Sequence, residues 1–217
     1  MGYAIMRIQK HKTSSSIVAA ERHAIQRDRL KHREHIERTK DNLFYRKHKD
    51  LTLLQAFNKE TENMKLRANG VRMLEIVLTC SPENGKDIEE QLTKWINTNM
   101  NWAAANFGGK ENIIFSHTDL DETTINQHIM LIPVYNGKLN CRHYTGDKFK
   151  LSALQSSYAK EMEQFNLDRG KCYLDLENAK DKPRHITLKE YYRRIEAERR
   201  KQLALKNVKI SIENINK

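Results

Sequence analysis

A chain of 217 residues is long enough to bury one domain with an additional helical segment, and 31% of its residues are charged. Its longest apolar run, residues 129–134, is far shorter than the roughly 20 residues that a membrane-spanning helix needs. The three cysteines, Cys80, Cys141 and Cys172, form no CxxC pair, which argues against a disulfide framework and a zinc ribbon. We therefore expect a cytoplasmic protein with reduced thiols.

The net charge of +11 is concentrated at the two ends of the chain. Residues 1–50 hold 13 Lys and Arg against 6 Asp and Glu, and residues 181–217 hold 11 against 5. The residues between these ends have a net charge of −2. Two basic flanks around a near-neutral middle favour a nucleic acid that is bound by particular faces. From charge alone, a ribosomal, membrane-surface or purely structural role stays open.

The first half of the chain predicts two strands separated by helices. The alternating apolar residues of YAIMRIQ, residues 3–9, indicate a strand, and a basic loop is expected at 10–16. The charged stretch that continues to about residue 40 has no Gly or Pro, so we expect a helix with one open face. A weaker helical pattern covers 51–67, and an Asn-Gly turn then precedes a buried strand, VRMLEIVLTC.

Helices and strands alternate in the second half. Apolar residues at helical spacing begin at Ile88, and a Gly-Gly pair at 108–109 should end that helix. The runs ENIIFSHTDL and QHIMLIPVY predict two antiparallel strands at the centre of a sheet. An amphipathic helix over 151–165, ending near Gly170, precedes a short strand, KCYLDL, and a basic helix that starts at Thr187. This order predicts an α+β fold, a two-layer sandwich with a central antiparallel sheet and flanking helices.

Six potential metal ligands lie where the two central strands meet. They are His117, Asp119, Asp121, Glu122, Asn126 and His128. His117 and Asp119 share one strand face, and Asn126 and His128 share one face of the next strand, so the two faces converge if the strands pair. This mixture of nitrogen and oxygen ligands suits Mn²⁺ or Mg²⁺, which would neutralise a scissile phosphate. The alternative is a solvated polar connection in which His128 is a hydrogen-bonded core residue.

Four segments resemble successive motifs of the plasmid mobilisation and recombination (Mob/Pre, or MobV-type) relaxases. They are GYAIMRIQKHK, RANGVRMLEIVLT, HTDLDETTINQHIMLIPVYNGKLN and FNLDRGK, in matching order over nearly the whole chain. The resemblance implies a histidine-hydrophobic-histidine (HUH) relaxase domain at 1–185, with about five antiparallel strands. Its expected activity is metal-dependent nicking and rejoining of one DNA strand at an origin of transfer, through a covalent 5′-phosphate adduct. Residues 186–217 would form a basic helical extension, through which two copies could pair.

The metal motif of that family is matched with two changes. The motif is His-Leu-Asp-Glu, three residues, then His-x-His, and its metal positions fall on Asp119, Glu122, Asn126 and His128. Asp119 and the amide oxygen of Asn126 would make the site richer in oxygen, and His117 offers a replacement imidazole. Because only two family residue types are kept, a second hypothesis stays open: a DNA-binding protein of the same fold that has lost the chemistry.

The resemblance also implies a histidine nucleophile close to an arginine, and His23 with Arg27 lies nearest that place. A neutral imidazole nitrogen can form a covalent phosphoramidate with the DNA 5′ end. Tyr45 is the competing nucleophile, and its phenolic oxygen would need the metal or a base to activate it. Glu122 completes the predicted catalytic set. As structural alternatives, His23 is a solvated helical residue and Tyr45 is an anchoring core aromatic.

DNA contacts are expected from the basic N-terminal region and from two motif-matched arginines. The residues are Arg7, Lys10, Lys12, Arg22, Arg27, Arg67 and Arg169. They would bind phosphates of a single-stranded or hairpin origin, so that affinity should fall steeply with salt. An RNA- or ribosome-associated basic protein is a third hypothesis, which rests on charge alone.

Overall fold

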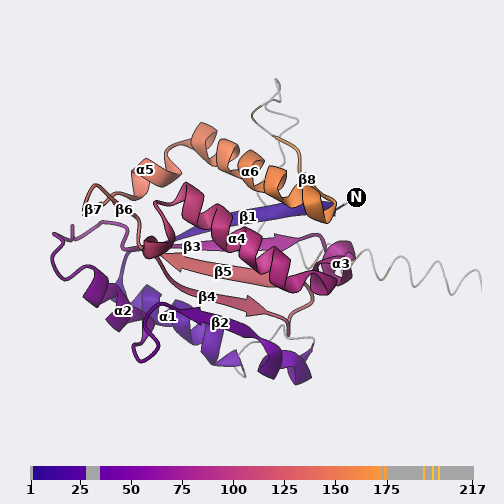
Figure 1. Cartoon of the computed structure of the whole chain (residues 1–217), viewed down its shortest axis with the longest axis horizontal. Helices are drawn as coiled ribbons and strands as arrows, with labels where there is room; N and C mark the ends of the chain where they lie inside the picture. Colours follow the sequence, from indigo (N-terminus) through magenta and orange to yellow (C-terminus); the bar gives the residue numbers. More distant parts are fainter. Residues whose placement is uncertain are drawn as a thin grey trace, which may run out of the picture. The chain divides into compact units, whose positions relative to one another are not determined.

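A mixed six-stranded sheet of order β2-β4-β5-β3-β1-β8 forms the centre of the described structure (Figure 1). Its strands are β1 (Gly2–His11), β2 (Leu43–Arg46), β3 (Met73–Cys80), β4 (Ile113–Asp119), β5 (Asn126–Leu131) and β8 (Leu167–Arg169). This computed structural model describes residues 2–27, 35–172 and 174, and the isolated positions 193, 197 and 200. By its internal contacts the chain divides into two compact units, Met1–Leu174 and Asp175–Lys217. The predicted final helix falls in the second unit, almost entirely outside the described residues. None of the described helices has the length and apolar character that a membrane span requires.

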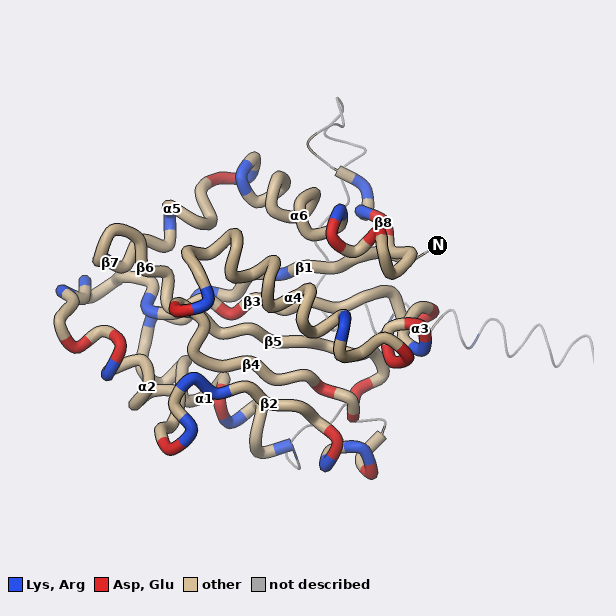
Figure 2. Tube along the Cα trace, viewed as in Figure 1, with Lys and Arg blue, Asp and Glu red and all other residues tan. Residues whose placement is uncertain are grey.

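Helices cover both faces of the sheet. α4 (Leu92–Asn106) and α6 (Lys148–Met162) contribute to one apolar cluster, and α1 (Ser14–Ile25) and α2 (Leu53–Glu60) contribute to a second. The strand β3 serves both clusters, because Leu74 and Ile76 join the first and Met73 joins the second. The charged positions lie mainly on helices, loops and strand ends, while the central strands are largely uncharged (Figure 2).

The predicted α+β class with a central sheet and flanking helices is confirmed, and three details differ. The sheet has six strands, both of its faces are covered, and β8 runs parallel to β1. The sequence predicts a last strand at KCYLDL, part of which lies outside the described residues, and the last strand among the described residues begins at Leu167. The helical segment ends at Phe165 because Asn166 adopts a left-handed conformation with φ 56°, which turns the chain back to the sheet edge.

The prediction of one helix up to about residue 40 is wrong in its length. Thr13 and Ser16 form a capping box that starts α1, which ends at Ile25. The next residue, Gln26, leaves the helical conformation with φ −93° and ψ 65°, and this directs Arg27 into the protein interior. Past the undescribed residues 28–34, the chain forms a 3-10 helix, η2 (Ile36–Asp41).

The edge strand β2 is absent from the predicted elements because four residues, LFYR, are too few for a clear alternation. The predicted helix over 51–67 is shorter in the structure, where α2 starts at the Thr52 capping box. The helix before the Gly-Gly pair is confirmed as α3 (Gly85–Glu90) and α4. The run QHIMLIPVY is divided: β5 ends at Leu131, and β6 (Val134–Tyr135) pairs with β7 (Lys138–Leu139) in a separate hairpin, which precedes α5 (Cys141–Thr145).

Candidate metal and nucleic-acid site

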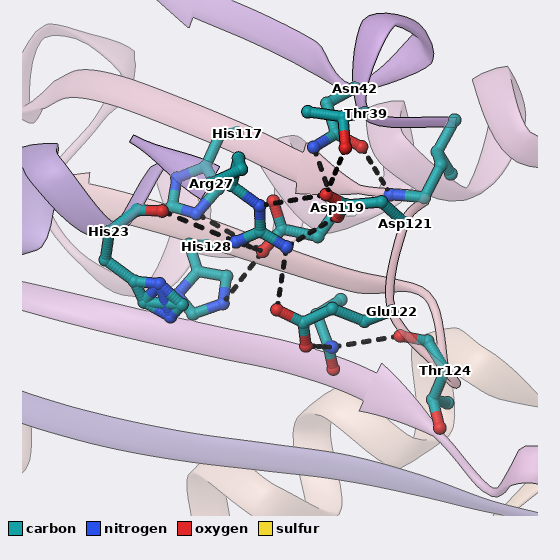
Figure 3. Close-up of polar contacts among 12 residues, drawn as sticks. His23, Arg27, Thr39, Asn42, His117, Asp119, Asp121, Glu122, Thr124 and His128 are labelled. Atoms are coloured by element: carbon teal, nitrogen blue, oxygen red, sulfur yellow. Dashed lines mark hydrogen bonds and ion pairs between the residues drawn. The ribbon is translucent and has the colours of Figure 1, made fainter. Parts of the chain in front are cut away.

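The two central strands bring two histidines and an aspartate together on the α1 face of the sheet (Figure 3). His117 pairs with His128 across β4 and β5, and their stacked rings have centroids 4.4 Å apart. The Oδ2 atom of Asp119 lies 3.5 Å from Nε2 of His117 and 3.7 Å from Nε2 of His128. One potential ligand atom from each of these residues lies within 4.8 Å of the others. The three residues are called the ligand group below.

Several buried polar atoms of the ligand group make no hydrogen bond to the described residues, and Nε2 of His117 has only the 3.5 Å contact to Asp119 within the group. Both ring nitrogens of His117 and the Oδ1 atom of Asp119 are buried without a hydrogen bond. Burial lowers the pKa of His117, which keeps its imidazole neutral and able to donate an electron pair. Because buried polar groups are nearly always satisfied, these unpartnered nitrogen and oxygen atoms fit a bound divalent cation.

The carboxylate of Glu75, on β3, joins two imidazoles behind the ligand group. Its Oε1 lies 2.7 Å from Nδ1 of His128, and its Oε2 lies 2.8 Å from Nε2 of His11. Burial alone would raise the pKa of Glu75, but the hydrogen bonds from His11 and His128 outweigh it and hold the pKa well below its usual range. The sequence offered one signal for Glu75, an acidic residue inside the buried strand VRMLEIVLTC.

Arg27 is 2% exposed and its guanidinium contacts three carboxylates. It donates to Asp121 at 2.5 Å, to Glu122 at 2.8 Å and to Asp119 at 3.2 Å. Burial opposes ionisation of Asp121, but the hydrogen bonds that it accepts, first from Arg27, lower its pKa to about 2. The structure thus places Arg27 in an internal ion-pair cluster, where the sequence predicted a contact to DNA phosphate.

The carboxylates near the ligand group exceed the positive charge that faces them. Asp119, Asp121 and Glu122 contact a single guanidinium, that of Arg27, so these three carboxylates and one cation leave a net charge of −2. Uncompensated negative charge in a buried region is costly. The electrostatics of the described residues therefore favour a cation at this place, in agreement with the unpartnered atoms.

Glu122 and Asn126, two residues predicted to bind the metal, lie beside the ligand group and contact each other. Oε1 of Glu122 accepts from Arg27, and its Oε2 accepts from Nδ2 of Asn126 at 2.9 Å. The same Nδ2 also donates to the carbonyl of Thr124. The close ligand group contains His117 in addition to the predicted Asp119 and His128.

His23 and Tyr45 lie in different places relative to the ligand group. The ring of His23, on α1, has its centroid 5.7 Å from that of His128 and 6.4 Å from that of His117. Tyr45 pairs with Ser116 on β4, one residue out of step with His117, so its side chain lies on the other face of the sheet. It is 42% exposed rather than a core aromatic. The structure brings His23 to the ligand group and does not bring Tyr45 there.

The predicted DNA-binding residues are spread over several surfaces. Arg7, Lys10, Lys12, Arg22 and Arg67 are exposed and form no side-chain hydrogen bond or ion pair with another described residue. Arg169 is half-buried and donates to Oγ of Ser152 at 2.7 Å. Lys10 and Arg67 line a groove formed with the loop after α2 and the β6–β7 hairpin.

The fold matches that of a solved relaxase domain. The MobM relaxase domain (MOBV; Mob_Pre), in a Mn-bound structure with a 22-nucleotide plasmid pMV158 oriT DNA, superposes with a TM-score of 0.72 at 25% identity, covering 88% of this chain and 99% of that one. A Mn-bound structure with a 23-nucleotide oriT DNA gives the same TM-score and identity, over 89% of this chain and 98% of that one. The class defined by fold and site is therefore that of the relaxase domains.

The chain belongs to the plasmid recombination enzyme (Mob/Pre) family, whose family model matches residues 1–201. The "65 kDa protein" of Zymomonas mobilis subsp. mobilis is 34% identical over 176 residues, which cover 77% of this chain and 30% of the relative. "Plasmid recombination enzyme type 3" of Mammaliicoccus lentus is 23% identical over 218 residues, 90% of this chain and 49% of the relative. This chain thus spans half or less of the length of these curated relatives.

Proposed function

We propose that this protein is a DNA relaxase, which binds an origin of transfer and nicks and rejoins one strand through a covalent 5′-phosphate adduct. The observation that carries the proposal is the position of His23 next to the ligand group of His117, Asp119 and His128. A nucleophilic imidazole beside a divalent cation site is the arrangement that phosphoryl transfer to histidine requires. We assign this activity to residues 1–185 and propose that residues 186–217 form a basic extension.

The ligand group would hold a divalent ion, for which we propose Mn²⁺ or Mg²⁺. The two imidazoles and the carboxylate form a mixed donor set that such ions accept. The Mn-bound structures of the MobM relaxase domain support manganese. When bound, the ion would stabilise negative charge on the scissile phosphate. Glu75 would orient His128 from behind, as an outer carboxylate does for many metal-bound histidines.

His23 would attack the scissile phosphorus with a neutral ring nitrogen. The new P–N bond replaces the P–O3′ bond, the imidazole gives its ring proton to water, and the leaving 3′ oxygen takes a proton from water. The bond energy is kept in the phosphoramidate, so a returning 3′ hydroxyl can displace His23 and reseal the strand. Arg27 and Glu122 would position the segment that follows α1 against the loop that follows β4, since their ion pair joins these two segments.

The test is covalent capture of DNA from a random-sequence pool of single strands, which lets the protein select its own origin. The protein is incubated with Mn²⁺ and this pool, and DNA that stays attached after denaturation is sequenced. We expect attachment at the 5′ side of one preferred sequence, loss of attachment in His128→Ala, and retention in His35→Ala, which removes an exposed histidine side chain that is not part of the ligand group. Absence of any adduct from the unsubstituted protein would contradict the nicking proposal.

A second candidate function is DNA binding without chemistry. The observation that favours it is the 3.2 Å hydrogen bond from Arg27 to Oδ2 of Asp119, which supplies positive charge to an atom of the ligand group. Two histidine positions of the family motif are also changed, to Asp119 and Asn126. Calorimetry separates the candidates: a divalent-ion site that disappears in His128→Ala supports nicking, and DNA binding without such a site supports the second function.

A further inference from the structure

A basic groove lies at the end of the sheet where β1 ends and β3 begins. It has a volume of about 1140 Å³, and its walls are the loop after α2 on one side and the β6–β7 hairpin with α5 on the other. Six cationic residues line it, and no Asp or Glu is among its lining residues. The six are Lys10, Lys65, Arg67, Arg72, Lys138 and Arg142.

The positive charge of the groove is not a consequence of the overall composition. Five of the six cations come from the middle of the chain, whose net charge is −2, so basic residues are gathered here while acids lie elsewhere. Apart from Arg72, which donates to Oγ of Ser14, these cations form no side-chain hydrogen bond or ion pair with another described residue. Unpaired cations that face each other repel. A bound anionic ligand would offset this repulsion and stabilise the groove.

The groove is also lined by an exposed aromatic ring, and a tight hairpin turn lies at its edge. The rings of Tyr135 and His143 are stacked with centroids 3.4 Å apart, and Tyr135, which lines the groove, is 40% exposed. Asn136 and Gly137 form the hairpin turn with φ values of 49° and 69°, a conformation that fixes the direction of the hairpin. Cations around an exposed aromatic ring suit a phosphate backbone with its bases.

We propose that this groove is a second DNA-binding site, separate from the ligand group, that binds the phosphodiester backbone of DNA outside the cleaved position. The hairpin begins six residues after His128, past the end of β5 and a turn in which Val134 N–H donates to the carbonyl of Ile132, so it lies within about 20 Å of His128 along the chain. At the axial rise of a duplex this corresponds to at most about six base pairs. The groove would therefore hold DNA a short distance from the scissile phosphate and set the register of the strand that enters the ligand group.

The proposal rests on the DNA binding in the proposed function and does not require nicking. It is tested by fluorescence anisotropy in EDTA, with a mixed-sequence single strand and a hairpin of equal length, over a series of salt concentrations. In the Lys138→Ala/Arg142→Ala double variant we expect weaker binding, and a slope of log affinity against log salt that is smaller by about two. The matched control is Lys86→Ala/Lys160→Ala, which removes the same charge from exposed, unpaired lysines on α3 and α6 and should change the slope little.

A charge-preserving variant separates a charge effect from a folding effect. Lys138→Arg/Arg142→Lys should restore the slope, and circular dichroism should show the same thermal transition for all variants. A larger loss on the hairpin assigns the groove to a base-paired arm, and an equal loss assigns it to a single strand. The proposal is overturned if the groove variant and the control change the slope equally, or if neither changes it. If the slope falls in the groove variant while covalent capture finds no adduct, the nicking proposal fails and this one stands.

Discussion

The Nδ1 atom of His128 lies 2.7 Å from Oε1 of Glu75, so Nδ1 donates to this carboxylate while Nε2 faces Asp119. In a neutral imidazole of this tautomer, Nε2 carries the free electron pair on the side of the ligand group. His11 binds the second oxygen of Glu75 at 2.8 Å and thereby fixes the orientation of the carboxylate. Glu75 on β3 thus orients the imidazole ring of His128 on β5.

Glu75→Gln should weaken Mn²⁺ binding by about 10- to 100-fold, because a neutral amide supports the imidazole of His128 less well than a carboxylate does. Titration calorimetry with Mn²⁺ measures the change, and Glu75→Asp should recover part of the affinity. Unchanged affinity in Glu75→Gln would show that this contact does not tune the site.

His117→Ala should weaken Mn²⁺ binding by more than about tenfold, whereas Asn126→Ala should have a small effect. The reason is that His117 belongs to the ligand group, while the amide of Asn126 donates to Glu122. The same calorimetry compares the two variants. A greater loss in Asn126→Ala would instead support the ligand set that the family motif implies.

Arg27→Ala should lower the free energy of unfolding by about 3 to 5 kcal/mol, since it leaves buried carboxylates without their cation. Urea denaturation in EDTA measures the loss. The matched control is Arg38→Ala, which removes an ion pair between partly exposed Arg38 and Glu89 and should cost less than about 1 kcal/mol. Equal losses in the two variants would mean that the internal cluster stabilises no more than a surface pair.

Acid should destabilise the metal-free protein between about pH 4 and pH 2. The pKa of Asp121 is lowered from 3.8 to about 2 in the folded state, so its contribution is present above the unfolded value and is lost as the pH falls through the folded one. The loss is on the order of 2 kcal/mol. Asp121→Asn should flatten this part of a pH series of urea transitions, and an unaltered slope there would rule out Asp121 as its cause.

The covalent adduct should depend on His23 and not on Tyr45. His23→Phe is expected to abolish attachment of DNA, and Tyr45→Phe to retain it, because Tyr45 lies on the opposite face of the sheet. The bond itself can be identified by acid treatment, since a phosphoramidate is hydrolysed by mild acid and a tyrosine phosphate ester survives. An acid-stable adduct that disappears in Tyr45→Phe would reverse this assignment.

Much of the fold could be predicted because its signals are local. The alternation in β1, the apolar runs of β3, β4 and β5 and the Gly-Gly end of α4 are all visible within a few residues of sequence. The short β2 could not be predicted, since a four-residue edge strand is defined by pairing with a partner far along the chain. The length of α1 also escaped prediction, because its end depends on the burial of Arg27 among carboxylates that lie about ninety residues away.

The sequence by itself determined the family, through four motifs in register, and the place of the site, through a cluster of polar residues on two consecutive strands. Only the tertiary structure decided which of those residues meet. A shift of one residue in strand pairing moves every side chain to the opposite face, so register selects His117 and His128 as neighbours and leaves Tyr45 on the far side. The contacts of Glu75 and Arg27 were likewise decided by the packing of distant strands and helices, because buried charges take whatever partners the closed fold brings within reach.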